Sequence, residues 1–205
     1  IASFRTPGGE HTLDITTPQK WTSETPYLYT MIIEIAGVYY SIKVGFRDVK
    51  IKNQQFYING VSVKLLGANH HDTHYLYGHT VPFDVLVEDV ILMKQNGMNC
   101  VRTSHYPPDT RFLDLCDEYG LFVIDEADLE SHGDNVSDHA LSSNPDWESA
   151  FIDRAIRMVR RDRCHPSIVI WSLGNESGTG GTNHKAMAKA VRDIDDTRPI
   201  HYERD

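Results

Sequence analysis

The chain has 205 residues, 40% of them hydrophobic and 24% charged, which is enough apolar material for a folded core in one domain or one and a half. Its net charge of −9 argues against nucleic-acid and anionic-membrane partners, because both need a basic face. No apolar run approaches the ~20 residues of a membrane span, and residues 1–20 lack the pattern of a signal peptide. With three cysteines and no C-x-x-C motif, the sequence predicts a cytoplasmic protein.

Strand-like runs dominate the chain up to residue 47. Residues 28–35 and 39–44 are rich in β-branched and aromatic side chains, and Ala36-Gly37 between them suits a tight hairpin turn. A β-sandwich needs about seven strands, which is more than this stretch supplies. We therefore interpret residues 1–47 as the C-terminal part of an immunoglobulin-like β-sandwich domain.

From residue 48 the pattern alternates between strands and helices, after a hairpin around Asn59-Gly60. Apolar runs predict strands at 63–67, 100–103, 121–124 and 168–171, with a further strand at about 200. Helical periodicity predicts helices at 84–96, 109–119 and about 184–195, and an arginine-rich helix that includes residues 152–163. Gly97 and Gly120 end the first two helices. The arginine run fits a solvated helix face better than a phosphate site.

Apolar strands that alternate with helices indicate a parallel sheet covered on both faces, so the fold class is α/β. A doubly wound sheet and a (β/α)8 barrel both fit. The barrel is favoured because polar residues recur at the end of nearly every strand, where barrel enzymes keep their chemistry. A full barrel takes about 250 residues. Residues 48–205 are thus expected to form the N-terminal half of a (β/α)8 catalytic barrel, a partial TIM barrel.

Polar clusters follow four of the predicted strands and should converge on one pocket, at residues 69–74, 102–106, 125–133 and 172–178. Glu176 stands out because it closely follows an apolar strand, beside Asn175 and among glycines. A carboxyl group at the rim of an apolar wall is placed as a general acid requires. The alternative is a structural carboxylate that caps the following helix, which Ser177 or Thr182 could do equally well.

Glu130 and His132 lie two residues apart in a polar loop, so an extended backbone would point both side chains the same way. Carboxylate oxygens and one imidazole suit Mg2+ or Mn2+ better than a structural zinc, with Glu176 as a third ligand. The spacing of Glu130 and His132 alone favours an ordinary surface pair over a metal site. His71, His74 and His105 are candidates for sugar-hydroxyl recognition, for metal ligation or for packing. His70 and Asp72 loosely resemble the first-strand motif of metal-dependent amidohydrolases.

Five segments resemble glycoside hydrolase family 2, specifically its large β-galactosidases, in order along nearly the whole chain. Residues 21–29 resemble W-S-A-E-N-P-Y-L-Y of the sandwich, and residues 67–72 resemble G-V-N-R-H-E. Residues 101–107 resemble V-R-x-S-H-Y-P, residues 125–133 resemble D-E-A-N-I-E-T-H-G, and residues 165–178 resemble H-P-S-V-I-I-W-S-L-G-N-E-S-G. One departure is His70, where the family usually has Arg.

The resemblance implies a retaining enzyme that cleaves terminal β-galactosides, with Glu176 as the acid/base and Asn175 as a partner of the sugar 2-hydroxyl. It implies Glu130, His132 and Glu176 as ligands of an active-site Mg2+, and His71 and His105 as sugar contacts. β-Glucuronidases and β-mannosidases of the family share the Asn-Glu pair but generally lack the E-x-H-G loop, so Glu130 and His132 favour β-galactosides. The family's nucleophile is a glutamate on a later barrel strand. The family's Na+ site also lies mostly on other segments.

These expectations make the remainder of the same protein the chain's main partner, in a homo-oligomer when full length. The isolated 205 residues are expected to be inactive. Two other classes remain open. A metal-dependent hydrolase would use His70, Asp72 and His105, and a non-catalytic fragment would bind sugar or complete another chain.

Overall fold

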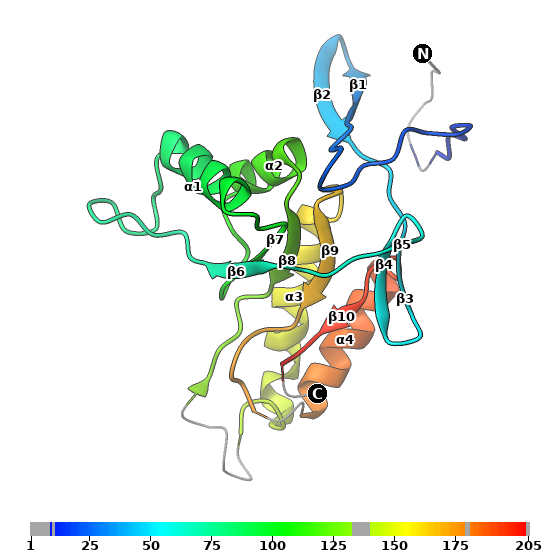
Figure 1. Cartoon of the computed structure of the whole chain (residues 1–205). Helices are drawn as coiled ribbons and strands as arrows, with labels where there is room; N and C mark the ends of the chain where they lie inside the picture. Colours follow the sequence, from blue (N-terminus) through cyan, green and yellow to red (C-terminus); the bar gives the residue numbers. More distant parts are fainter. Residues whose placement is uncertain (1–8, 10, 133–139, 179–180, 204–205) are drawn as a thin grey trace.

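The computed structural model describes residues 9, 11–132, 140–178 and 181–203, so Gly133, the last position of the fourth family-like segment, lies outside the described residues. The described strands form three sheets. Strands β1 (Tyr29–Ile35) and β2 (Val38–Val44) form an antiparallel hairpin that projects from the rest of the chain (Figure 1). Ala36 and Gly37 in its turn both have positive φ, at 51° and 83°, which confirms the predicted tight turn.

Two further sheets follow. Strands β3 (Val49–Lys52), β4 (Gln55–Ile58) and β5 (Val61–Ser62) form a small antiparallel sheet. The main sheet holds β6 (Gly67–His70), β7 (Cys100–Thr103), β8 (Phe122–Glu126), β9 (Ile168–Ser172) and β10 (Ile200–His201). All its pairs are parallel, and each strand lies beside the next one along the chain. A doubly wound sheet reverses its strand order, so this order confirms the partial barrel.

A helix follows each of the first four strands of the main sheet. They are α1 (Phe83–Gln95), α2 (Thr110–Tyr119), α3 (Glu148–Asp162) after the short 3-10 helix η2 (Pro145–Trp147), and α4 (Thr182–Ile194). The Asp109 side chain accepts a hydrogen bond from the backbone N–H of Arg111 at the start of α2, and Gly120 ends α2 with a φ of 77°. In the part of the chain described, no helix has both the length and the apolar character that crossing a membrane requires.

The first barrel strand lies later than the sequence predicts. Residues 63–66 were expected in this strand, but β6 begins at Gly67 and includes Asn69 and His70, which pair with Arg102 and Thr103 of β7. A Cβ atom at position 67 would collide with the backbone of Cys100, so only glycine permits this approach of the two strands. Val63 and Leu65 instead pack against an apolar cluster. The apolar pattern at Val63 and Leu65 therefore indicates packing against this cluster and not pairing within the main sheet.

The main sheet has apolar clusters on both faces. One cluster joins the sheet to the helices and includes Val101, Val123 and Trp171. The other covers the opposite face, where Cys100, Phe122 and Val169 pack against Trp21, Val49 and Ile58 from the chain before the barrel. Side chains of one strand alternate between these two faces, which decides where each polar residue at the strand ends points.

Candidate active site

The carboxyl ends of β8 and β9 stay side by side beyond the strands themselves. Glu130 and Asn175 form an isolated parallel bridge, and the backbone N–H of Asn175 donates to the carbonyl of Leu129 at 2.9 Å. Gly174 makes this contact possible, because its φ is 124° and a Cβ there would lie 2.5 Å from the Leu129 carbonyl oxygen. The bridge places the loop that bears Glu130 and His132 directly against the loop that bears Asn175 and Glu176.

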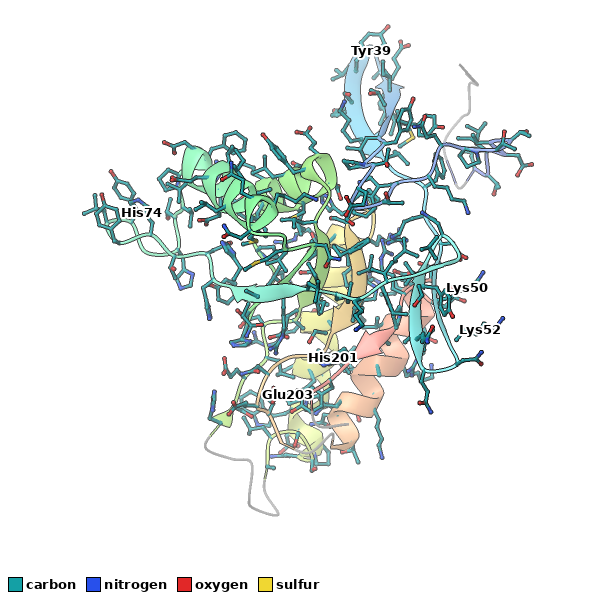
Figure 2. The ribbon with its side chains drawn as sticks, viewed as in Figure 1. Tyr39, Lys50, Lys52, His74, His201 and Glu203 are labelled. Atoms are coloured by element: carbon teal, nitrogen blue, oxygen red, sulfur yellow. The ribbon has the colours of Figure 1, made fainter. Side chains whose placement is uncertain are left out.

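Glu176 projects from this bridge into a partly open site, with 41% of its side chain exposed. Its φ of 36° is rare for a residue with a side chain. The backbone N–H of Glu176 donates to Oε1 of Glu203 at 2.8 Å. Figure 2 shows Glu203 and His201 together at this end of the sheet. Helix α4 begins later, at Thr182, after Gly181 and with no side-chain cap. Glu176 is therefore not the cap of that helix.

Glu130, His132 and Glu176 form one group, joined by a hydrogen bond and an ion pair. Nδ1 of His132 lies 2.9 Å from Oε2 of Glu176, and Nε2 of His132 contacts Oε1 of Glu130. The hydrogen bond to Glu130 raises the pKa of His132, and the charges of Glu176 and Glu203 add to this against a smaller effect of burial. Burial raises the pKa of Glu130, but hydrogen bonds from Asn175 and His132 outweigh it, so the net shift is downward.

The donor set of this group fits a hard divalent cation, because it offers two carboxylates and one imidazole. The ring of His132 lies between the two carboxylates and contacts both. Within the described residues, a different set, Asp114, Asp117 and His165, brings three possible ligand atoms within 4.8 Å of one another. That set is structural, since the Asp117 carboxylate accepts from Ser167 N–H at 2.9 Å and contacts His165 Nδ1 at 2.6 Å.

His71 and His105 lie together at the ends of β6 and β7, with ring centroids 5.4 Å apart. His105 contacts Glu126 through Nδ1 at 2.6 Å, and Arg102 contacts Glu126 through Nε at 2.5 Å. Arg102 also donates to Oδ1 of Asn175 at 3.0 Å. The structure therefore connects His105 to Asn175, as the convergence of strand ends predicts.

Sequence reasoning did not single out Arg102, Glu126 and Glu203. Arg102 and Glu126 stand inside the polar clusters, but nothing in composition separates them from their neighbours. Strand alternation predicts only that Asp125 and Glu126 face opposite sides of the sheet, and the register of β8 decides which side each one faces. Val123 faces the helices, so Asp125 does too, and Glu126 must face the other side with Arg102.

The alternative metal site on His70, Asp72 and His105 is not assembled. His70 stacks on Phe112 with ring centroids 4.5 Å apart, and its Nε2 contacts Asp89 at 3.0 Å. The Asp72 carboxylate accepts the backbone N–H of Asp109 at 2.7 Å. These two residues therefore anchor β6 to α1 and α2. His74 stacks on Tyr77 in the loop after β6, and Figure 2 shows it far from Glu203.

Comparison with known proteins identifies the family. The profile described as "Glycosyl hydrolases family 2, TIM barrel domain" matches residues 49–205. A β-galactosidase of Alteromonas mediterranea is 45% identical over 198 residues, which cover 94% of this chain and 19% of that protein. A β-galactosidase of Kluyveromyces lactis is 43% identical over 99% of this chain and 23% of its own length. The chain thus spans about a fifth of the curated relatives it matches.

Solved structures give the same fold. A β-D-glucuronidase of Dictyoglomus thermophilum superposes with a TM-score of 0.83 at 27% identity, over 92% of this chain and 35% of its own. A β-galacturonidase of Eisenbergiella tayi bound to galacturonate gives 0.81 at 28% identity, over 94% and 35%. With the profile covering most of the residues and relatives above 40% identity, this chain belongs to glycosyl hydrolase family 2 and carries part of its TIM barrel domain.

Proposed function

We propose that the protein containing this chain is a retaining β-galactosidase, with Glu176 as its general acid/base. The observation that carries this proposal is the single group of Glu176, His132, Glu130 and Asn175, which ion pairs and hydrogen bonds hold together at the carboxyl ends of neighbouring parallel strands. Barrel enzymes keep their reacting groups at this edge. His71 and His105 stand beside the group, where they would contact the sugar.

Retaining hydrolysis needs two carboxyl groups about 5–5.5 Å apart. In the first step Glu176 would give its proton to the glycosidic oxygen while the second carboxylate attacks the anomeric carbon. In the second step the Glu176 carboxylate would take a proton from water, which attacks the same carbon and frees the second carboxylate. The resemblance assigns that nucleophile to a glutamate on a later barrel strand.

Galactosides are favoured over uronides by sequence. The two relatives named β-galactosidase are 43–45% identical to this chain, whereas the structures named β-glucuronidase and β-galacturonidase are 27–28% identical. A uronide also carries a carboxylate, which needs a cationic side chain to bind it. Arg102 of this site is already paired with Glu126 and is not available for that role. Comparing the nitrophenyl β-galactoside, β-glucuronide and β-mannoside as substrates decides among them. Preference for the glucuronide or the mannoside would refute the galactoside assignment.

The variant Glu176→Gln tests the catalytic role. Removing a general acid/base costs about 10²- to 10⁴-fold in rate, and we expect that loss in kcat for an alkyl β-galactoside. A dinitrophenyl galactoside needs no proton for its departure, so azide should restore turnover by attacking the intermediate and should yield the β-galactosyl azide. Glu118→Gln makes the same change on the exposed surface of α2 and should leave kcat unchanged. Full activity of Glu176→Gln, or an α-azide product, would contradict the proposal.

We also propose that Glu130, His132 and Glu176 hold Mg2+, or Mn2+ in its place. The cation would supply positive charge beside the acid/base and order its carboxylate. Titration calorimetry with MgCl2 should show binding to the wild-type protein and at least tenfold weaker binding to Glu130→Gln. Equal binding by both proteins would place the cation elsewhere.

The cellular setting is a separate proposal that rests on the cysteines. Cys100, Cys116 and Cys164 are all free thiols, as a reducing cytoplasm maintains them. We propose a cytoplasmic homo-oligomer, to be tested by cell fractionation and by light scattering of the purified protein. Recovery from the secreted fraction, or a monomeric mass, would contradict it.

A further inference from the structure

Glu126 is a fully buried carboxylate at the end of β8. An ionised carboxylate without partners would be very costly there, so its contacts are informative. Oε2 accepts from Arg102 Nε at 2.5 Å and from Ser172 Oγ at 2.7 Å, and Oε1 contacts His105 Nδ1 at 2.6 Å. One carboxylate therefore joins β7, β8 and β9 at their carboxyl ends.

Arg102 transmits the orientation of Glu126 to Asn175. Its guanidinium is planar, so fixing Nε on Glu126 also fixes the direction of Nη2. Nη2 donates to Oδ1 of Asn175 at 3.0 Å, while Nδ2 of Asn175 donates to Oε1 of Glu130 at 2.8 Å. The amide of Asn175 is thereby held from both ends, with its oxygen directed to Arg102 and its nitrogen directed to Glu130.

The same carboxylate determines which nitrogen of His105 carries a proton. A carboxylate only accepts hydrogen bonds, so Nδ1 of His105 must be the donor in this contact. In the neutral ring Nε2 is then the acceptor, and it is the nitrogen left to meet a sugar hydroxyl. A neutral amide at position 126 could not impose this tautomer.

We propose that Glu126 is a positioning residue, which orients Asn175 through Arg102 and sets the tautomer of His105. The inference rests on the proposed function, because Asn175 and His105 act on a sugar only there. Asn175 is expected to meet the sugar 2-hydroxyl, so losing the buried carboxylate should matter most for substrates that carry this hydroxyl.

The test compares nitrophenyl β-galactoside with its 2-deoxy analogue in the protein that contains this chain. Outer partners of site residues typically contribute about 10- to 100-fold, so Glu126→Gln should lower kcat/KM by that factor on the galactoside. The loss on the 2-deoxy substrate should be about tenfold smaller. Azide should not restore turnover in Glu126→Gln, which separates it from Glu176→Gln.

Two further variants keep the test decisive. Asp195→Asn removes another buried carboxylate held by an arginine, Arg198, in the segment between α4 and β10 and away from the site. It should lower the melting temperature while kcat/KM stays unchanged on both substrates. Arg102→Lys keeps a cation beside Glu126 but loses the donor to Asn175, and it should repeat the substrate dependence if Glu126→Gln does not fold. Equal losses on both substrates would overturn the inference, while azide rescue of Glu176→Gln would still uphold the proposed function.

Discussion

Gly174 is the residue on which the geometry of the site most depends. Its φ of 124° lies in a region that is essentially reserved for glycine. A methyl group would also press on the Leu129 carbonyl that receives the N–H of Asn175. The bridge between the Glu130 and Asn175 loops therefore requires both the freedom and the small size of this glycine.

The variant Gly174→Ala should separate these loops and lower kcat by at least tenfold. Gly97→Ala is the matched control, since Gly97 also has a positive φ, 75°, but has open space where a Cβ would lie. The control should cost only the left-handed strain of about 1–2 kcal/mol and keep its kcat. Kinetic constants and thermal melts of both variants measure this difference. Equal kcat in the two variants would show that the bridge is dispensable.

Sequence reasoning at the residue scale found the acid/base candidate and its neighbours, because polar residues at strand ends follow directly from the alternating pattern. It did not find the network that orients them. Nothing in the string Asp125-Glu126 says that one carboxyl faces α3 and the other faces Arg102. That follows only from the register of β8, which a one-residue shift would reverse.

Strand β8 and helix α3 each carry one of a pair of interacting buried carboxyl groups, Asp125 and Asp162. Asp162 is fully buried and bound by two donors of Arg161, at 2.6 and 2.8 Å. Burial, followed by the charge of Asp162, raises the pKa of Asp125 well above its usual value. The folded protein therefore keeps a proton on Asp125 at a pH where the unfolded chain has lost it.

This pair predicts how stability depends on pH. Above the ordinary aspartate pKa the unfolded chain binds fewer protons than the folded chain, so Asp125 makes the stability fall as the pH rises. Asp125→Asn removes this pH dependence. The melting temperature of the variant, relative to that of the wild type, should therefore rise steadily from pH 4 to pH 8. Asp162→Asn should instead lower the melting temperature throughout, because Arg161 loses its partner. Parallel pH curves for Asp125→Asn and the wild type would contradict the raised pKa of Asp125.

Among the elements, the helices and the later strands were predictable and β6 was not. Apolar runs bounded by glycine located β7, β8 and β9 to within two residues. β6 carries the polar sequence Asn69-His70 and pairs because Gly67 lets its backbone approach Cys100. Because backbone contact and not apolar side chains holds β6 in the sheet, its sequence has no apolar pattern from which the strand could be predicted.

At the scale of the whole molecule, the main sheet is open, with β6 and β10 each paired on one side only among the described strands. Unpaired strand edges recruit other chains. The hairpin β1–β2 adds exposed apolar side chains, including Ile32, Ile35 and Tyr39.

We therefore expect the isolated 205 residues to associate or aggregate and to hydrolyse nitrophenyl galactoside at no measurable rate. Size-exclusion chromatography and an activity assay of the purified fragment check both points. Substantial turnover by a monomeric fragment would mean that a nucleophile lies within these residues.

Trp21 lies before the proposed domain boundary at residue 47 but packs against the barrel. Its indole lies fully buried against Phe122, and Nε1 donates to the backbone carbonyl of Asp117, whose side chain holds His165 and the start of β9. The ammonium group of Lys94 also donates a hydrogen bond to the carbonyl of Ser23, two residues after Trp21. A shortened protein that began at residue 48 would lack Trp21 and would leave Phe122 and its apolar neighbours uncovered. A version of the barrel for expression in another protein therefore has to begin before Lys20.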